Sequence, residues 1–208
     1  MDGTSIAIVL LFVIAIFSSM PNQPPGQAPS EVVGPRSELF KVTISAADIP
    51  PANYFIPPGQ NLESNICDFI TAYARPANRG YAPQIAGAIM KYSQEYDVNP
   101  RLLTALIARE SRFNPQAVSS HGALGLGQLL PQTASSMGAE DAFDVDQNVK
   151  ATTRYLKYLL DKWQDENMQV PLALASYLAG PNAIKQTTGL SDSTHGYVAD
   201  ILQLYNRI

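Results

Sequence analysis

The chain has 208 residues, of which 46% are hydrophobic and 15% charged, and its formal net charge is −4 at pH 7. This length supports one sizeable core, and an acidic chain without a run of Lys or Arg is not expected to bind nucleic acid, which requires a phosphate-neutralising surface. Because Cys67 is the only cysteine and the two histidines are far apart, we predict no internal disulfide, no metal site and no cofactor.

The first apolar segment is the unbroken run IAIVLLFVIAIF from Ile6 to Phe17. With its uncharged flanks it is just long enough to cross a bilayer as a helix. A cleaved signal peptide is the competing interpretation, but such a peptide begins with basic residues, whereas the only charged residue before this run is Asp2. We therefore predict a retained transmembrane anchor over residues 1–20, which makes a lipid membrane an expected partner.

The next segment, residues 21–60, contains nine prolines, including three Pro-Pro pairs. Proline removes a backbone donor and disfavours helix and central strand, so this composition predicts an extended, semi-stiff tether. Inside it, the stretch 39–44 alternates apolar and polar residues, which would suit a short strand.

From Asn61 onward the spacing of apolar residues is helical and predicts one compact, mainly α domain over residues 61–208. Asn99-Pro100 is a typical helix start, because a capping side chain is followed by proline in the first turn, and this helix is expected to run to about Arg112. The other predicted helices are 61–73, 83–96, 131–137, 146–163, 170–178, 182–186 and 197–205.

Glu110 is the first residue that indicates chemistry. It shares a helix face with Leu103, Leu106 and Ile107, which should point into the core. Burial raises the pKa of a carboxyl group, and a proton retained near neutral pH is what a general acid requires. The alternative is an ordinary ion pair with a nearby arginine, although Arg109 is a poor partner because adjacent residues on a helix point in different directions.

The residues that follow Glu110 resemble the catalytic domain of the soluble-type lytic transglycosylases, relatives of goose-type lysozyme in the lysozyme-like superfamily. The similarity extends from about Pro83 to Tyr205 and is carried by several motifs in the family's order. These are Glu110-Ser111, Gly122-Ala123-Leu124-Gly125-Leu126-Gly127-Gln128, Pro131-Gln132-Thr133-Ala134, Phe143-Asp144-Val145-Asp146-Gln147-Asn148-Val149, Ala175-Ser176-Tyr177-Leu178-Ala179-Gly180-Pro181 and Gly196-Tyr197-Val198.

This resemblance implies a fold with a central catalytic helix and a Gly-rich segment that forms part of a sugar-binding cleft. It assigns Glu110 as the sole catalytic acid and base. The positions implied to bind substrate are Ser119, Gln128 and Tyr177, and the positions implied to support the site are Ser111, Gly125, Ala179 and Gly180.

Three positions depart from the family's pattern. Leu178 stands where the family usually has asparagine after the tyrosine, which removes an amide that could contact substrate. Gly127 replaces a common methionine, so we expect a smaller and more flexible cleft wall at this point. Thr152 replaces a usual glycine in the following helix.

The function that the resemblance implies is cleavage of the β-1,4 bond between muramoyl and glucosaminyl sugars of peptidoglycan, with formation of a 1,6-anhydromuramoyl end. One alternative is a lysozyme-type hydrolase on the same fold, which would use a second carboxylate such as Asp144 or Asp146. A noncatalytic glycan-binding or structural wall protein is the alternative from another class. The predicted anchor suggests local wall opening in a bacterial envelope or from a phage virion membrane.

Overall fold

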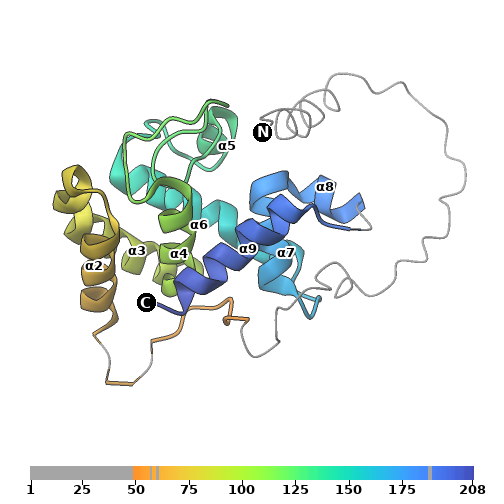
Figure 1. Ribbon diagram of the computed structural model, residues 1–208, viewed down its shortest axis with the longest axis horizontal. Helices are drawn as coiled ribbons and strands as arrows, with labels where there is room; N and C mark the ends of the chain where they lie inside the picture. The colour runs from red at the N-terminus through yellow and green to blue at the C-terminus, as the bar shows by residue number, and fades with distance from the viewer. Residues whose placement is uncertain (1–48, 57, 60, 187–188) are drawn as a thin grey trace, which may run out of the picture.

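The computed structural model describes residues 49–56, 58–59, 61–186 and 189–208, and within these ranges the chain is mainly helical (Figure 1). Two isolated bridges, Val118 with Leu124 and Leu124 with Leu129, are the only β pairing in the described part of the chain. The elements are α2 (Leu62–Tyr73), the 3₁₀ helix η3 (Pro76–Tyr81), α3 (Ala82–Tyr96), α4 (Pro100–Ser111), α5 (Pro131–Ser136), α6 (Val145–Lys162), α7 (Gln169–Ala179), α8 (Pro181–Gln186) and α9 (Asp192–Tyr205).

The predicted mainly α fold is confirmed, and most helix boundaries differ from the predicted ones by one residue. The exception is α9, which begins at Asp192 and not at Tyr197. The Ser191 hydroxyl caps it by accepting from the backbone N–H of Thr194 at 3.2 Å. The polar first turn of α9 concealed this start, because it carries little apolar periodicity. The element η3 escaped prediction for the same reason.

Helix α4 lies in the middle of the domain and is its most deeply buried element. Every residue from Leu102 to Ala108 is buried. Helices α2, α3 and α9 pack against α4, while α6 packs on α3 and α7. Figure 1 shows α9 crossing α4 near the centre, with α2 and α3 on one side and α7 and α8 on the other. The end of α4 therefore lies where several helices and the segment leading to α5 converge.

The two N-terminal regions predicted from sequence lie wholly or largely outside the described residues. The predicted anchor, residues 1–20, and the possible strand at 39–44 are both outside them. Within the part of the chain that the structure describes, no helix is long and apolar enough to span a membrane. The last part of the predicted tether is described and contacts the domain: the backbone N–H of Asn99 donates to the Ala52 carbonyl at 2.8 Å.

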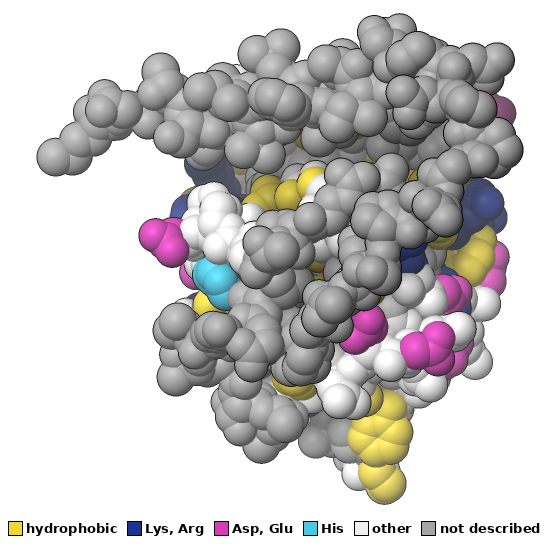
Figure 2. Space-filling view, turned by 90° about the vertical axis from the view of Figure 1, so that its right-hand side faces the viewer, with side chains coloured by type: hydrophobic (Ala, Val, Ile, Leu, Met, Phe, Trp, Pro, Cys, Tyr) yellow, Lys and Arg dark blue, Asp and Glu magenta, His cyan; other side chains and the backbone are white. Residues whose placement is uncertain are grey.

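Acidic and basic side chains are interspersed on the face drawn in Figure 2, where the visible Lys and Arg side chains form no continuous stripe. Cys67 is partly buried on α2 and packs against the core. Among the described residues, no group of three or more His, Cys, Asp or Glu side chains is placed to hold a metal ion.

Candidate active site

Helix α4 ends abruptly just after Glu110, because the next residues leave the helical conformation. Arg112 and Phe113 both have left-handed backbone angles, with φ of 51° and 57°. Phe113 is completely buried, and its ring meets those of Phe69 and Tyr73 edge-on at centroid distances of 6.2 and 6.3 Å. Burial of this aromatic ring compensates the strained backbone. The chain turns away after one residue, so Glu110 occupies the last turn of a buried helix and remains partly exposed.

The carboxylate of Glu110 accepts a hydrogen bond from the Tyr197 hydroxyl on α9. Burial raises the pKa of Glu110 from its ordinary value of 4.5 to about 7, and the Tyr197 hydrogen bond and the positive charge of Arg109 oppose this rise without cancelling it. Desolvation therefore dominates, as expected for a carboxyl group on an apolar helix face. A group with this pKa is present in both protonation states near neutral pH and can both donate and accept a proton.

Arg109, the cation closest to Glu110 in sequence, is paired with another acid. Its Nε lies 2.9 Å from Oδ2 of Asp200, and its guanidinium carbon lies 5.2 Å from the centroid of the Tyr197 ring. The simple Arg–Glu ion pair considered from sequence is therefore not the arrangement found. The hydrogen-bond partner of Glu110 in the structure is a tyrosine hydroxyl.

The Gly-rich segment between α4 and α5 is folded tightly by backbone hydrogen bonds. The Leu124 and Leu129 backbones exchange N–H···O bonds of 2.9 and 3.1 Å, and the Gly125 N–H donates to the Ala117 carbonyl at 2.9 Å. Gly125 has a φ of 71°, and a Cβ at this position would overlap the Ala142 carbonyl and the Asn148 amide. Only glycine satisfies both conditions, so the requirement at Gly125 is steric.

Asn148 of α6 joins this segment to the helical core. Its Oδ1 accepts from the Gly127 N–H at 2.9 Å, and its Nδ2 donates to the carbonyls of Leu124 and Ala142 at 3.3 and 2.7 Å. One buried side chain thus satisfies the Gly127 N–H and the Ala142 carbonyl, and it gives the Leu124 carbonyl a second donor beside the Leu129 N–H. The segment is held in a single position relative to α6.

Tyr177 of α7 lies between the Gly-rich segment and Glu110. Its hydroxyl donates to the Gly127 carbonyl at 2.8 Å, and its ring lies 5.1 Å from that of Tyr155. Burial, reinforced by the negative charge of Glu110, raises the pKa of Tyr177 well above its usual value. The hydroxyl therefore stays protonated and serves as a neutral hydrogen-bond donor beside the carboxylate.

The two family departures at positions 127 and 152 are in direct contact. A Cβ on Gly127 would overlap Oγ1 of Thr152 and lie 2.8 and 2.9 Å from its Cγ2 and Cβ. The threonine side chain thus occupies the space that a larger residue at position 127 would need. The space beside Gly127 is therefore filled by the buried Thr152 side chain, and the flexibility expected of the cleft wall at this point stays a prediction.

This contact predicts strong coupling between the two positions. We expect Gly127→Ala alone to destabilise the protein by about 2 kcal/mol, because the added methyl would overlap the buried side chain of Thr152. In a Thr152→Gly background the same change should cost little, which gives a coupling energy of about 2 kcal/mol. Urea unfolding of the four proteins in this double-mutant cycle measures it.

Gly196 provides the control for this cycle. It lies exposed within α9, with open space around its missing Cβ. Gly196→Ala should stabilise the protein slightly, since alanine has the better helix propensity. Additive effects at positions 127 and 152 would contradict the proposed contact.

The remaining predicted substrate-binding residues are held by the loop itself. The hydroxyl oxygen of Ser119 accepts from the N–H groups of His121 and Ala123 at 3.2 and 3.0 Å. Nε2 of Gln128 donates to the carbonyls of Ala117 and Gly125 at 3.2 and 2.9 Å. These bonds fix both side chains within the Gly-rich segment.

The predicted supporting residues mainly shape helix ends. The Ser111 hydroxyl donates to the Ile107 carbonyl at 3.3 Å in the last turn of α4. Gly180 ends α7 with a φ of 84°, and its N–H donates to the Ser176 carbonyl at 2.8 Å. Ala179 packs against the core as the last residue of α7, whereas Leu178 is 45% exposed.

Tyr197 is the site residue that sequence reasoning missed. In the sequence it is part of the closing helix motif, and its spacing of 87 residues from Glu110 gives no indication of a hydrogen bond. Asn148 likewise belongs to a motif that assigns it no role. The available signal was that each is a polar or amphipathic side chain at an otherwise apolar position of its helix.

The two acids considered as a second catalytic carboxylate are engaged elsewhere. Asp144 caps α6 by accepting from the Gln147 N–H at 2.9 Å. Asp146 accepts from the Tyr92 hydroxyl and lies 3.4 Å from Nζ of Lys91. Neither contacts Glu110, and the charged group that most influences the Glu110 pKa is Arg109.

Comparison with known sequences gives one family match and several curated relatives. The family model of the Transglycosylase SLT domain matches residues 87–198. A transglycosylase of Enterobacteria phage PRD1 is 39% identical over 90 residues, which cover 43% of this chain and 32% of the phage protein. The membrane-bound lytic murein transglycosylase F of Shewanella woodyi is 32% identical over 123 residues, covering 55% and 26%. The chain thus spans about a third or less of the length of these relatives.

Solved structures with the same fold are also found. The lytic transglycosylase Slt of Pseudomonas aeruginosa superposes with a TM-score of 0.51 at 22% identity, over 57% of this chain and 23% of that one. The 70 kDa soluble lytic transglycosylase of Escherichia coli gives a TM-score of 0.54 at 17% identity, over 70% and 29%. At these identities the similarity establishes the fold.

Proposed function

The chain belongs to the transglycosylase SLT domain family, and from this premise we propose that it is a peptidoglycan lytic transglycosylase with Glu110 as its only catalytic carboxylate. The observation that supports this proposal most strongly is the environment of Glu110. It is a carboxyl group at the end of a buried helix, hydrogen-bonded by a tyrosine, with a pKa of about 7.

The reaction requires one group to act first as an acid and then as a base. Protonated Glu110 donates to the glycosidic oxygen between a muramoyl and a glucosaminyl sugar, and the C–O bond to the muramoyl C1 breaks. The N-acetyl group of the muramoyl sugar stabilises the cationic carbon. Ionised Glu110 then takes the proton of the C6 hydroxyl, whose oxygen attacks C1 and closes the 1,6-anhydro ring. Glu110 ends protonated, ready for another cycle.

The hydrogen bond from Tyr197 suits this double use. It stabilises the carboxylate that forms after proton donation, while burial stabilises the protonated acid. The two influences oppose each other and hold the pKa near neutrality, where neither proton transfer is strongly uphill. Tyr177 is proposed to orient substrate beside Glu110, and Ser119 and Gln128 to contact the sugars from the Gly-rich segment.

A single carboxylate also favours the transglycosylase over the hydrolase. A conventional glycosidase uses two carboxyl groups on either side of the scissile bond. Among the described residues, the acids weighed for that second position, Asp144 and Asp146, cap a helix or bind Tyr92 and Lys91. The C6 hydroxyl of the substrate replaces the water that a second carboxylate would activate.

The predicted anchor and tether remain part of the proposed function. An anchored enzyme acts within reach of one membrane, so it would open the wall locally and not digest it throughout. This chain is similar to a protein named as a phage transglycosylase and to one named as a membrane-bound lytic murein transglycosylase. Both names are consistent with such a task. Fractionation of the full chain with purified virions or with cell envelopes distinguishes the two settings.

Product analysis tests the proposed reaction. Purified glycan strands digested by the protein should yield chains that end in 1,6-anhydromuramic acid, each lighter by one water than the corresponding reducing end. Mass spectrometry of the products measures this ratio. Reducing ends without the anhydro form would reject the transglycosylase in favour of the hydrolase, and intact strands would favour a noncatalytic protein.

A further inference from the structure

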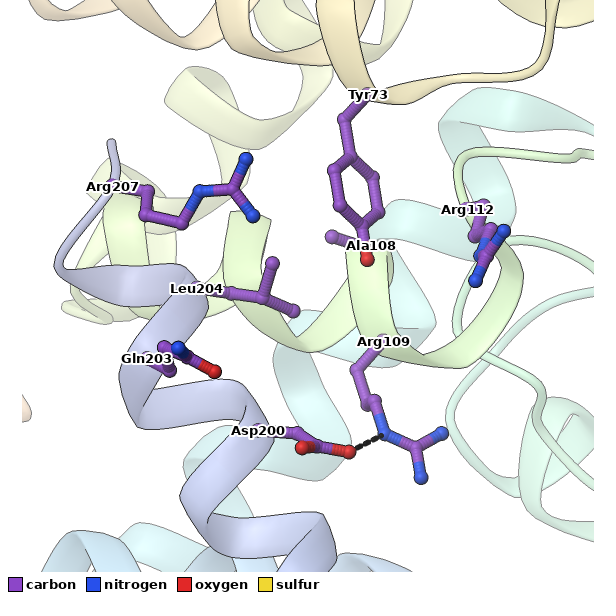
Figure 3. A pocket seen from close by; sticks show the side chains of 8 residues that line it. All are labelled: Tyr73, Ala108, Arg109, Arg112, Asp200, Gln203, Leu204 and Arg207. Carbon is purple, nitrogen blue, oxygen red and sulfur yellow. Dashed lines mark hydrogen bonds and ion pairs between the residues drawn. The ribbon is translucent and has the colours of Figure 1, made fainter.

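A surface pocket of about 310 Å³ lies between α2, α4 and α9 (Figure 3). Its lining is rich in arginine and does not include Glu110. Arg207 and Arg112 stand on opposite sides in the view of Figure 3, and the ion pair between Arg109 and Asp200 lies below them. The other lining residues are Tyr73, Ala108, Gln203 and Leu204.

The charge in this pocket is not balanced by the residues that line it. Three guanidinium groups face one carboxylate, that of Asp200, which is already paired with Arg109. Among the described residues, Arg112 and Arg207 have no acidic partner, although Arg207 lies with its guanidinium carbon 5.9 Å from the Tyr73 ring centroid. In a chain with a net charge of −4, two exposed guanidinium groups without an acidic partner in one pocket offer donors that suit an anion.

The pocket begins close to the candidate catalytic acid. Arg109 precedes Glu110 in α4, and the same Arg109 guanidinium lies against the Tyr197 ring, whose hydroxyl donates to Glu110. One aromatic ring therefore separates the pocket edge from the carboxylate. From Asp200 the lining continues along α9 to Leu204, a rise of about 6 Å, and then to Arg207 in the turn that follows the helix.

We propose that this pocket binds the carboxylates of the short peptide carried by the muramoyl sugar of the strand that Glu110 cuts. The inference rests on the proposed function, because it places that sugar at Glu110. Two extended peptide residues span about 7 Å, close to the rise of the α9 turn from Asp200 to Leu204 that lines the pocket. The planar guanidinium groups of Arg112 and Arg207 suit bidentate pairing with carboxylates, and the Gln203 amide is suited to a peptide backbone.

The test compares three substrates: glycan strands stripped of peptide by an amidase, strands with intact peptides, and strands whose peptide carboxylates have been amidated. For the wild type, kcat/KM should be highest on intact peptides. In the double variant Arg112→Gln/Arg207→Gln, kcat/KM on intact strands should fall about tenfold, which corresponds to the loss of a modest charged contact. Its kcat/KM on stripped and amidated strands should stay at the wild-type value.

Arg79→Gln is the matched control, since Arg79 is an exposed arginine of η3 outside the pocket. Equal cleavage of intact and amidated strands by the wild type would overturn the proposal, as would an equal loss on all three substrates in the double variant. Failure of the wild type to cut any strand would instead contradict the proposed function, so the two failures are distinguishable.

Discussion

Replacing Glu110 with glutamine should lower the rate of glycan cleavage on the order of 10³-fold or more, without unfolding the protein. General acid–base catalysis by a positioned group contributes about 10² to 10⁴ in rate, and here one group serves both proton transfers. Glutamine keeps the size of the side chain and an oxygen that accepts from Tyr197, so the packing at the end of α4 is retained. The measurement is release of soluble fragments from purified peptidoglycan, with circular dichroism to verify folding.

Glu63→Gln is the matched control for this experiment. Glu63 is an exposed acid in the first turn of α2, and its neutralisation changes the net charge by the same amount. Its activity should equal that of the wild type. If Glu110→Gln retained wild-type cleavage, catalysis would have to be assigned to another residue.

Replacing Tyr197 with phenylalanine should change both the rate and its pH dependence. The Tyr197 hydroxyl donates to the Glu110 carboxylate and so lowers a pKa that burial has raised to about 7. Loss of that donor favours the protonated form, so the pKa of Glu110 rises further. Because the acid must be protonated to act, activity is lost as pH rises through its pKa, and the alkaline limb of kcat/KM should move to higher pH in the variant.

The rate at the pH optimum should fall in the same variant by about 10- to 100-fold, the usual effect of losing a hydrogen bond to a charged group. The ring, with its contact to Arg109, is retained by phenylalanine. Tyr205→Phe on the same helix serves as the control, with an unchanged pH profile expected. An unshifted alkaline limb in Tyr197→Phe would mean that the hydroxyl does not act on the catalytic acid.

Local patterns in the sequence were sufficient to predict most of the helices and the placement of Glu110, but not η3 or the start of α9. The apolar spacing of Leu103, Leu106 and Ile107 places this carboxylate on a buried face, and the Asn99 cap fixes where α4 starts. The Oδ1 atom of Asn99 accepts from the backbone N–H groups of Arg101 and Leu102, at 3.0 and 3.3 Å. Signals of this kind depend on residues within one or two turns and are readable without the fold.

The contacts that complete the candidate site join residues far apart in sequence. Tyr197 reaches Glu110 from α9, and Tyr177 reaches Gly127 across 50 positions. In the sequence, Gly127 and Thr152 are two separate departures from the family's pattern. In the structure, the Thr152 side chain occupies the space that a side chain at position 127 would need. Such pairings follow from how helices pack, which helical periodicity does not specify.

The central claim, that Glu110 retains its proton near neutral pH, is tested most directly by NMR titration of its side-chain carboxyl carbon. Protein labelled with ¹³C on glutamate carboxyl groups gives one signal for each glutamate, and Glu110→Gln identifies the signal of interest by its disappearance. We predict a midpoint near pH 7. A midpoint near 4.5, the ordinary value for glutamate, would show that burial does not hold the proton and would contradict this assignment of the catalytic acid.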